Sequence, residues 1–359
     1  MTSFAVRPVN YWELSEMKWI SDSRIDHLRA VASQPDFSAT KYTIVNELAR
    51  GGMGTVYLAE DRELTRQVAV KVLSAAESDD DTRQRMLREA QVIARLEHPG
   101  IVPVHDVGTL PDGRIYYAMK YVRGERLDEY VRTNESSNDR LRKFQAVCDA
   151  VAFAHSHAVV HRDLKPQNIM IGSFGEVLVL DWGVAKLLSD HRVTSAEADT
   201  LRLRPKEVPP VIDETTTEGT VIGTKHYMSP EQSRGETHLV DERSDVYSLG
   251  VVLYFLLTNQ TPATTDSRFQ KPREINSNVS KQAEAVCLRA MSMDRSARYS
   301  SASELAAEIG RLLDAQPVSA YREGLIEKVI RWLSKNRFIV LLVLSYLLMR
   351  IILLLTSQR

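Results

Sequence analysis

The stretch that decides the fold is HRDLKPQN at residues 161–168. Within six residues it carries a carboxylate, a cation and a carboxamide, contributed by Asp163, Lys165 and Asn168. A single aspartate in a loop is usually only a solvated side chain. These three groups in this order, followed by a further acid, instead indicate a site of chemistry in which a carboxylate orients and deprotonates a hydroxyl group.

That further acid, Asp181, begins the motif DWG eighteen residues after Asp163. The apolar runs 169–171 and 177–180 flank a turn that contains glycine, which predicts a hairpin. This hairpin would bring Asn168 and Asp181 together. Two oxygen ligands that converge there suit Mg²⁺, a cation that takes few protein ligands besides phosphate oxygens. Asp163 would then remain available for the hydroxyl group.

Two weaker motifs precede these. The sequence ARGGMGTV at 49–56 lies between two predicted strands, and a hairpin without side chains can lay its backbone N–H groups over a triphosphate. Taken alone, such a hairpin is more often merely a turn. The sequence VAVK at 68–71 then places Lys71 on the next strand, where an isolated lysine is usually solvated. Both motifs gain their meaning from the two that follow.

The order of the predicted elements is strand-rich first and helix-rich afterwards, which indicates an α+β chain in two lobes with a crossing at 120–124. We expect strands over 42–48, 54–60, 67–73, 101–107 and 115–121, and helices over 82–96, 141–157, 244–257, 281–293 and 300–314. The polar stretch 189–220 reads as a long loop inside a domain, of the kind that is usually functional or disordered.

In these motifs the chain resembles the eukaryotic-type (Hanks) protein kinases, especially their bacterial serine/threonine branch. The resemblance covers residues 42–314 and implies the bilobal protein kinase fold, with an N-lobe at about 42–119 and a C-lobe at about 124–314. It also implies ATP between the lobes, Mg²⁺ (with Mn²⁺ as a substitute) as the metal, and proteins as substrates.

The resemblance assigns catalytic roles residue by residue. Asp163 corresponds to the catalytic base and Lys165 to the residue that steadies the transferring phosphoryl group. Lys71 corresponds to the lysine on the α- and β-phosphates, with Glu89 as its ion-pair partner. The helix supports the role of Glu89, because this residue shares one face with three apolar residues, which are Met86, Ile93 and Leu96.

The nucleotide and metal sites follow in the same way. The metal ligands would be Asn168 and Asp181. The expected nucleotide contacts are Gly51, Gly52, Met53, Gly54, Val56, Ala69, Lys71, Met119, Lys120, Val122 and Met170. Among these, Met119 falls at the gatekeeper position, and the backbone of Lys120 and Val122 falls at the hinge. Lys165 and Thr224, in the stretch GTKHYMSPE at 223–231, are the markers of serine/threonine specificity.

The resemblance also implies supporting roles, and the residues themselves suggest a regulatory one. Glu231 should pair with Arg298, and Asp245 should anchor the backbone of the catalytic loop. Arg162 has no partner in the chemistry, and a phosphate on one threonine of the segment 215–220 would supply one. The alternative without a regulatory role is that this run of threonines is simply a solvated loop.

The chain departs from the family pattern in five places. Ala49 stands where the first glycine of the phosphate loop is expected, Trp182 replaces a phenylalanine, and Ser229 replaces an alanine. None of these changes removes a reacting group. The loop 184–222 is longer than expected, and the segment 258–280 is short, which puts substrate docking in question but not catalysis.

Charge and cysteine content limit the other functions. A net charge of −1 gives no field that would favour nucleic acid, so we expect no nucleic-acid partner. The two cysteines, Cys148 and Cys287, lie far apart in predicted helices and are expected to be free, buried thiols in a reducing compartment.

The two ends of the chain lie outside the resemblance. Residues 1–40 form an extension of unknown role, and no signal peptide is recognised there. The apolar stretch 338–355 would span about 27 Å as a helix, which is just enough for a bilayer core. Its Arg350 is costly in a membrane but close enough to the end to snorkel outward, and the segment 315–337 before it is basic and amphipathic, as expected of a juxtamembrane flank. A helix packed on the domain and an oligomerisation helix are the alternatives.

We therefore expect a single-pass protein of the cell membrane with a cytoplasmic kinase domain, which phosphorylates serine and threonine in proteins and itself in trans. The rival from another class is a pseudokinase, a membrane-anchored scaffold that has lost the reaction. It is disfavoured because Lys71, Asp163, Asn168 and Asp181 are all present. A small-molecule kinase of related fold is disfavoured by the stretch 223–231.

Overall fold

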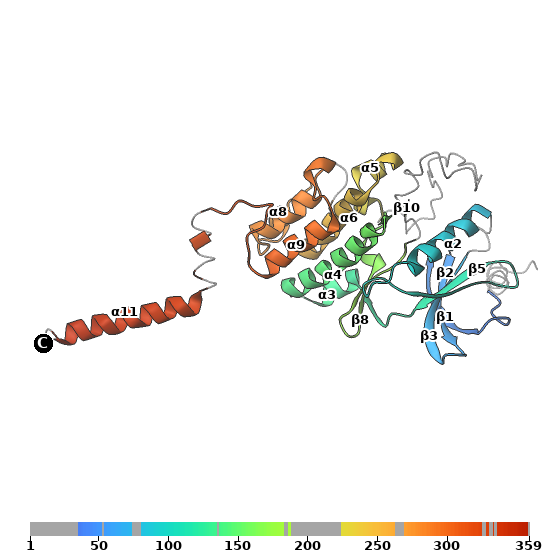
Figure 1. Ribbon diagram of the computed structural model, residues 1–359, viewed down its shortest axis with the longest axis horizontal. Helices are drawn as coiled ribbons and strands as arrows, with labels where there is room; N and C mark the ends of the chain where they lie inside the picture. The colour runs from blue at the N-terminus through green and yellow to red at the C-terminus, as the bar shows by residue number, and fades with distance from the viewer. Residues whose placement is uncertain are drawn as a thin grey trace, which may run out of the picture. The chain divides into compact units, whose positions relative to one another are not determined.

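The computed structural model describes residues 35–51, 54–73, 80–134, 136–182, 186–187, 224–262, 269–324, 328–329, 333 and 336–357. Contacts divide the chain into two compact units (Figure 1). The first unit comprises residues up to Met86 together with Asp106–Ala118, and the second comprises Leu87–His105 together with Met119 onward. The predicted change from strands to helices along the chain is therefore also a change of structural unit.

The first unit is built on a five-stranded sheet with the strand order β1-β2-β3-β5-β4. The strands are β1 (Tyr42–Gly51), β2 (Gly54–Asp61), β3 (Arg66–Leu73), β4 (Val104–Thr109) and β5 (Ile115–Lys120). Alternate residues of β3, namely Val68, Val70 and Val72, are buried in one core with Tyr42 and Tyr116. Because side chains of a strand alternate between faces, Ala69 and Lys71 lie on the other face.

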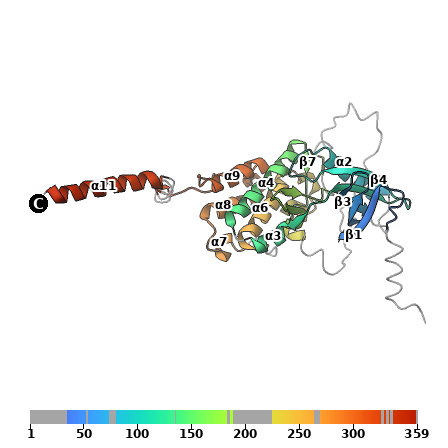
Figure 2. The ribbon, with the colours of Figure 1, turned by 90° about the horizontal axis from the view of Figure 1, so that it is seen from below.

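The second unit is mainly helical, and its core is formed by helices that lie side by side. In both Figure 1 and Figure 2, α4 runs alongside α6 and α9, and these helices contact one another. The longer helices of this unit are α3 (Leu127–Thr133), α4 (Ser137–Ser156), α6 (Glu242–Thr258), α8 (Lys281–Ala290) and α9 (Ala302–Leu313), and α2 (Asp80–Ala94) begins in the first unit and ends in the second. Shorter helices are η3 (Pro166–Asn168), η5 (Thr224–Tyr227), α5 (Pro230–Ser233), η6 (Thr237–Leu239), α7 (Pro272–Ile275) and η7 (Arg295–Ala297).

Local sequence determines where several of these helices begin. The side chains of Ser136, Asp241, Ser280 and Ser301 each accept a hydrogen bond from a backbone N–H in the first turn of α4, α6, α8 and α9. Such caps satisfy donors that have no partner within the helix. In α4 and α6 the sequence pattern predicted the helix, and the cap moved its start a few residues upstream.

Short strands place the loops of the second unit. β6 (Gly124–Arg126), β8 (Ile169–Gly172) and β9 (Val177–Val179) form a three-stranded sheet in the order β6-β8-β9. β7 (Val159–Val160) pairs with β10 (Lys186–Leu187). Both sheets lie next to the HRDLKPQN stretch in sequence, which fixes the two ends of that loop.

The predicted elements agree with the observed ones in type, and the elements that were not predicted are all short; they include the strands β6, β7 and β10 and the helix α5. α3 and α7 were not predicted, and the strand expected to begin at residue 101 begins at Val104, while Ile101 makes an isolated bridge with Val179. Beyond α9 the chain still packs on the second unit, because Val318 is buried and the Ser319 N–H donates to Glu308. Both cysteines are buried and unpaired, as predicted.

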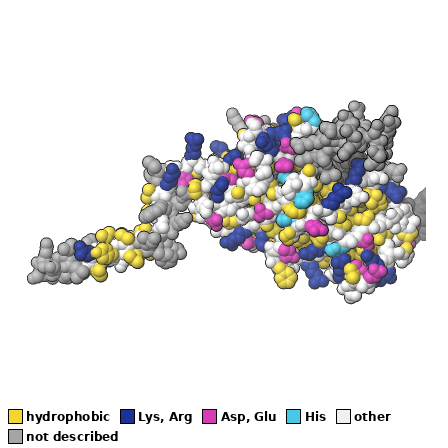
Figure 3. Space-filling view, in the orientation of Figure 1, with side chains coloured by type: hydrophobic (Ala, Val, Ile, Leu, Met, Phe, Trp, Pro, Cys, Tyr) yellow, Lys and Arg dark blue, Asp and Glu magenta, His cyan; other side chains and the backbone are white. Residues whose placement is uncertain are grey.

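The C-terminal stretch forms the helix α11 (Arg337–Ser357). Its described side chains from Leu341 to Met349 present mostly exposed apolar groups, visible in Figure 3 as a nearly continuous hydrophobic surface. By length and hydropathy, no helix in the described part of the chain qualifies as a membrane span. The predicted span at 338–355 is therefore not confirmed.

Several predictions lie outside the described residues. These are the extension up to residue 34, the nucleotide contacts Gly52 and Met53, the long loop with its threonines at 215–220, and residues 263–268 of the short segment.

Candidate active site

The catalytic loop of the second unit holds three predicted functional groups in direct contact. The Lys165 Nζ lies 2.8 Å from Asp163 Oδ2. The Asn168 Nδ2 donates to the backbone oxygen of Asp163 at 2.8 Å and to its Oδ2 at 3.1 Å. Asp163 and Lys165 each expose 19% of their side chains, so the carboxylate can reach a substrate. The structure thus brings together the groups that the sequence placed within six residues.

The β8–β9 hairpin places Asp181 beside this loop, as predicted. Ile169 pairs with Val179, and the Leu180 N–H donates to the Asn168 oxygen at 2.8 Å. Asn168, just before β8, and Asp181, just after β9, therefore lie at the same end of this hairpin. Asp181 is exposed and has a φ of 58°, a left-handed conformation that is uncommon outside glycine and is often found at functional sites.

Asn168 and Asp181 fit a divalent cation. The Asn168 amide donates through Nδ2, which leaves its Oδ1 as the ligand atom, and Asp181 contributes a carboxylate. The described residues contain no cluster of three or more His, Cys, Asp or Glu side chains that could hold a metal by themselves. A pair of oxygen donors is nevertheless what Mg²⁺ takes when substrate phosphates complete its coordination.

A buried carboxylate fixes the backbone before Asp163. Asp245 is fully buried on α6, and its two oxygens accept the N–H groups of His161 at 2.8 Å and Arg162 at 2.9 Å. His155 Nε2 lies 2.8 Å from the same carboxylate. Burial alone would raise the pKa of Asp245, but the contacts with His155, His161 and Arg162 outweigh it and hold this pKa below its ordinary value. Asp245 is therefore ionised and anchors the loop.

Two further contacts complete the support of the loop. The Gln232 Nε2 donates to the backbone oxygen of Arg162 at 2.8 Å, and the ring centroids of Trp182 and His161 are 4.5 Å apart. Arg162 itself has a φ of 71°, and burial lowers the pKa of its guanidinium, an effect that the charge of Asp245 opposes. The Trp182 side chain is almost fully buried, so the replacement of phenylalanine is accommodated as core packing.

The predicted gatekeeper, one hinge residue and one adenine contact lie in one small apolar cluster of the second unit. Met119, Val122 and Met170 pack with three residues that were not predicted for the site, which are Val102, Leu178 and Leu180. The Lys120 N–H is used in a hydrogen bond to the Pro103 oxygen at 3.1 Å. The cluster can form the apolar side of an adenine site.

The first unit holds the remaining predicted contacts on one face of its sheet. Val56 pairs with Lys71, and Leu58 pairs with Ala69, so Val56, Ala69 and Lys71 share a face. Lys71 is buried to 8% exposure, and its Nζ lies 5.8 Å from the centroid of the Tyr117 ring. Lys71 is therefore buried on this face and not a solvated surface side chain.

The glycine hairpin closes between Gly51 and Gly54, which face each other in the register of β1 and β2. Gly54 has a φ of 153°, and a Cβ built there would lie 2.2 Å from the Val72 oxygen. Only glycine allows this close approach. Glu89 is buried on α2 together with Met86 and Ile93, and Leu96, just beyond the end of this helix, is buried as well, so the predicted apolar face is confirmed.

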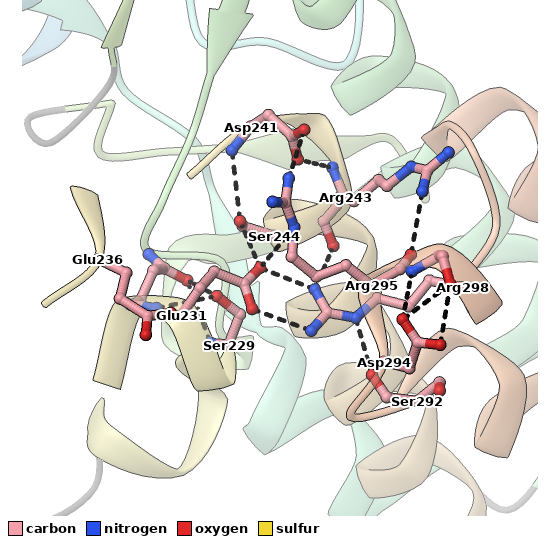
Figure 4. Close-up of polar contacts among 12 residues, drawn as sticks. Ser229, Glu231, Glu236, Asp241, Arg243, Ser244, Ser292, Asp294, Arg295 and Arg298 are labelled. Carbon is pink, nitrogen blue, oxygen red and sulfur yellow. Dashed lines mark hydrogen bonds and ion pairs between the residues drawn. The ribbon is translucent and has the colours of Figure 1, made fainter. Parts of the chain in front are cut away.

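A buried ion pair braces the end of this region (Figure 4). Arg298 donates to both oxygens of Glu231, at 2.8 Å and 2.9 Å, and also to the Ser292 and Arg243 oxygens. The Ser244 hydroxyl donates to the same carboxylate at 2.7 Å. Although burial opposes it, this set lowers the pKa of Glu231 to about 2. The predicted pair is confirmed as a buried, bidentate one.

Sequence reasoning missed several of the residues that act through others, although it did predict Asp245 and the pair of Glu231 and Arg298. His155 and Gln232 carry no local signal, because each contacts the loop or its anchor from a distant part of the chain. Arg295 adds a second ion pair, to Asp241 at the N-terminus of α6. Only the three-dimensional fold brings these residues into contact with the loop and its anchor.

Comparison with known proteins agrees with this geometry. Residues 42–338 match the protein kinase domain family. The chain is 38% identical over 305 residues to the serine/threonine-protein kinase PknB of Mycolicibacterium smegmatis, covering 80% of this chain and 45% of that protein. It is 34% identical over 297 residues to PrkC of Bacillus subtilis, covering 79% and 42%. The chain thus spans less than half the length of these relatives.

Solved structures give the same answer. The kinase domain of Mycobacterium tuberculosis PknI is 27% identical, with a TM-score of 0.56, over 76% of this chain and 96% of that one. The chain therefore belongs to the protein kinase family, and the relatives it resembles are bacterial serine/threonine-protein kinases.

Proposed function

We propose that this chain is an active, ATP-dependent protein kinase that transfers the γ-phosphoryl group to serine or threonine hydroxyls of proteins. The observation that carries the proposal is the contact of Asp163 with Lys165 and Asn168, beside a hairpin that holds Asp181. A scaffold without catalysis would have no need for this set. Lys165 and Thr224, together with the relatives' printed names, support hydroxyl substrates of the serine/threonine kind.

Asp163 is proposed to accept the proton of the substrate hydroxyl as the phosphoryl group is transferred. The Asn168 amide and the Lys165 ammonium hold its carboxylate in place, while Lys165 also lies close enough to stabilise negative charge on the transferring group. Asn168 and Asp181 would hold Mg²⁺, which supplies neutralisation of the phosphate charge when bound. Mn²⁺ is a chemically reasonable substitute.

The nucleotide contacts are proposed residue by residue from the family resemblance. The hairpin from Gly51 to Gly54 offers backbone N–H groups to the phosphates, and Lys71 contributes a cation to the α- and β-phosphates with Glu89 as its partner. Val56, Ala69 and Met170 would contact adenine, with Met119 as gatekeeper. This assignment follows the family resemblance, and the burial of Lys71 and Glu89 supports it.

The test is transfer of label from radioactive ATP to a protein substrate by the purified chain in the presence of Mg²⁺. We expect incorporation at serine or threonine, and a loss of roughly 10²-fold or more in Asp181→Asn, because the metal site loses its charged ligand. Asp314→Asn, an exposed aspartate after α9, is the matched control and should keep the wild-type rate. An Asp181→Asn rate within threefold of wild type would remove the assignment.

Autophosphorylation in trans is proposed as the means of activation. Arg162 is partly buried, and burial lowers the pKa of its guanidinium, so a partner for this charge would be favourable. A phosphothreonine from 215–220 would supply a bidentate partner. Phosphatase treatment should then lower the initial rate, and a lag should follow as ATP restores it. Fully active enzyme whose 215–220 peptide is unmodified by mass spectrometry would exclude this.

Tethering to a bilayer through 338–355 is proposed from the sequence, with the kinase domain on the cytoplasmic side. The exposed apolar side chains of α11 support a lipid or helical partner for this segment. Deletion of 338–359 should move the protein from the membrane fraction to the supernatant with its kinase rate preserved. A full-length chain that stays in the supernatant without detergent would argue instead for a helix packed on another surface.

A further inference from the structure

Trp182 carries a hydrogen-bond donor that the phenylalanine of the family pattern lacks. Its side chain is almost fully buried, and its indole N–H donates to the backbone oxygen of Val179 at 3.4 Å. A phenylalanine could also pack its ring against His161, but it could not form this bond, because a phenyl ring has no N–H group. The departure from the family pattern therefore adds one polar contact inside the core of the second unit.

The histidine ring that contacts Trp182 binds the same segment of backbone. The Asp163 N–H donates to His161 Nδ1 at 3.3 Å. Because a backbone N–H can only donate, Nδ1 is the acceptor and the proton of the ring lies on Nε2. His161 Nε2 therefore donates to the Leu180 oxygen at 3.0 Å. One buried histidine thus joins the backbone of the proposed base to the residue that precedes the proposed metal ligand.

These two contacts lie on either side of Asp181, whose backbone has an unfavourable conformation. Its φ of 58° is left-handed, and a residue other than glycine keeps such a conformation only where its surroundings impose it. Before Asp181, the Leu180 oxygen is held by His161. After it, the side chain of Trp182 is held by Val179. The bond from Trp182 to Val179 therefore spans the strained residue and opposes its rearrangement.

We propose that Trp182 is a positioning residue whose indole N–H holds Asp181 in the conformation that binds the metal. A binding conformation that is populated only part of the time lowers the apparent affinity by that fraction. Loss of the bond should therefore weaken metal binding about two- to fivefold, since the bond is long and a net hydrogen bond contributes on the order of tenfold at most. The inference rests on the proposed function only through the assignment of Asp181 as a metal ligand.

An isosteric replacement separates the hydrogen bond from the packing of the ring. In the full chain, benzothienylalanine in place of Trp182 keeps the shape of the indole and exchanges its N–H for sulfur, whereas Trp182→Phe also makes the ring smaller. Binding of Mn²⁺ to each protein with a non-hydrolysable ATP analogue is measured from the electron paramagnetic resonance signal of free Mn²⁺. We expect both variants to bind Mn²⁺ about two- to fivefold more weakly than the wild type.

The matched control removes a hydrogen bond of the same kind elsewhere in the second unit. Tyr254 is buried on α6, and its hydroxyl donates to the Gln270 oxygen at 2.8 Å. Tyr254→Phe should lower the thermal unfolding midpoint and leave the Mn²⁺ affinity at its wild-type value. With this control, a general loss of stability is distinguished from a change at the metal site.

The dependence of phosphoryl transfer on Mg²⁺ gives a second measurement. In both variants at position 182, the Mg²⁺ concentration for half the maximal rate should rise by the same factor, and the maximal rate should fall by less. Wild-type Mn²⁺ affinity in the benzothienylalanine protein would overturn the proposal, because a loss confined to Trp182→Phe is an effect of packing. That outcome leaves the proposed kinase reaction untouched. A wild-type chain that binds Mn²⁺ but transfers no phosphoryl group would overturn the proposed function and leave the role of Trp182 standing.

Discussion

The catalytic loop at 161–168 and the glycine hairpin at 49–56 are built in opposite ways. The loop is held by side chains from distant elements, with Asp245 accepting two of its N–H groups and Gln232 donating to its backbone. The hairpin is held by the register of β1 and β2 and by the conformation of Gly54. Gly51, which pairs with Gly54 at the tip of the hairpin, is exposed. Asp245, which anchors the catalytic loop, is fully buried.

This difference reflects what each region must supply. A reaction that moves a proton needs a charged group at a fixed distance. Buried polar contacts hold such a group in place, but the stability of the arrangement then depends strongly on each partner. A phosphate-binding backbone needs close approach more than rigidity. Substitutions should therefore have large, all-or-none effects around the loop and graded effects in the hairpin.

The largest effect is expected inside the loop. Asp163→Asn should lower the rate of phosphoryl transfer by about 10²- to 10⁴-fold, because the amide cannot accept the hydroxyl proton. The contacts with Lys165 and Asn168 can persist, so the thermal unfolding midpoint should stay within a few degrees of wild type. Initial rates and calorimetry check both parts. A rate close to wild type would show that Asp163 is not the base.

The next largest effect is expected at the buried ion pair of Glu231 and Arg298, called the brace here. Glu231→Gln should destabilise the chain by roughly 3–5 kcal/mol, because it removes the charge that compensates the buried Arg298. Urea unfolding measures this. Glu236→Gln is the matched control, since its pair with Arg234 is partly exposed and should contribute less than about 1 kcal/mol. Equal losses in the two variants would contradict the distinction between buried brace and surface pair.

The same brace predicts a dependence on pH. The pKa of Glu231 is lowered from 4.5 to about 2, so its stabilising effect is complete above about pH 4.5 and is lost as the pH falls toward 2. The loss amounts to at most about 3 kcal/mol. Urea unfolding of wild type and Glu231→Gln between pH 6 and pH 3 should show a stability difference that shrinks with acidification. A difference that stays constant would mean that this carboxylate does not titrate as described.

A smaller effect is expected in the hairpin. Gly54→Ala should cost about 1–3 kcal/mol of local strain, because the new methyl group would meet the Val72 oxygen, and it should raise KM for ATP more than it lowers kcat. Gly113→Ala is the control, since Gly113 also has a positive φ, 85°, but has no atom within 4 Å of the added Cβ. Similar effects on KM in both would show that the close approach at Gly54 is unimportant.

Local patterns predicted most of the fold. The strand expected at 54–60 is Gly54–Asp61, and the helix expected at 244–257 is Glu242–Thr258, because periodicity and caps act within a few residues. The helices α3 and α7 were not predicted because they are short, with seven and four residues. So few turns give too little periodicity to distinguish a helix from a loop.

The same distinction between local and distant contacts decides which residues of the site were predicted. Residues that act directly, such as Asp163 and Asn168, are encoded in contiguous motifs and were predicted. Asp245, Glu231 and Arg298 act through others and were predicted from the motifs of the family. His155, which contacts Asp245 across 90 positions, has no local pattern, because only the fold brings the two residues together. The sequence predicts the reacting groups better than it predicts what holds them.

The smallest effect separates the two regions most clearly. Ala49 stands where the family pattern has a glycine, and it pairs with Val56 across β1 and β2. Ala49→Gly should lower KM for ATP by less than about threefold, while the added chain entropy of glycine costs about 0.5–1 kcal/mol of stability. Steady-state kinetics and urea unfolding on the same protein measure both terms. Opposite signs for binding and stability would mean that the alanine stiffens the hairpin at some expense of nucleotide affinity. A tenfold or larger gain in affinity would mean instead that the methyl group blocks the phosphates, and that the hairpin is as exacting as the catalytic loop.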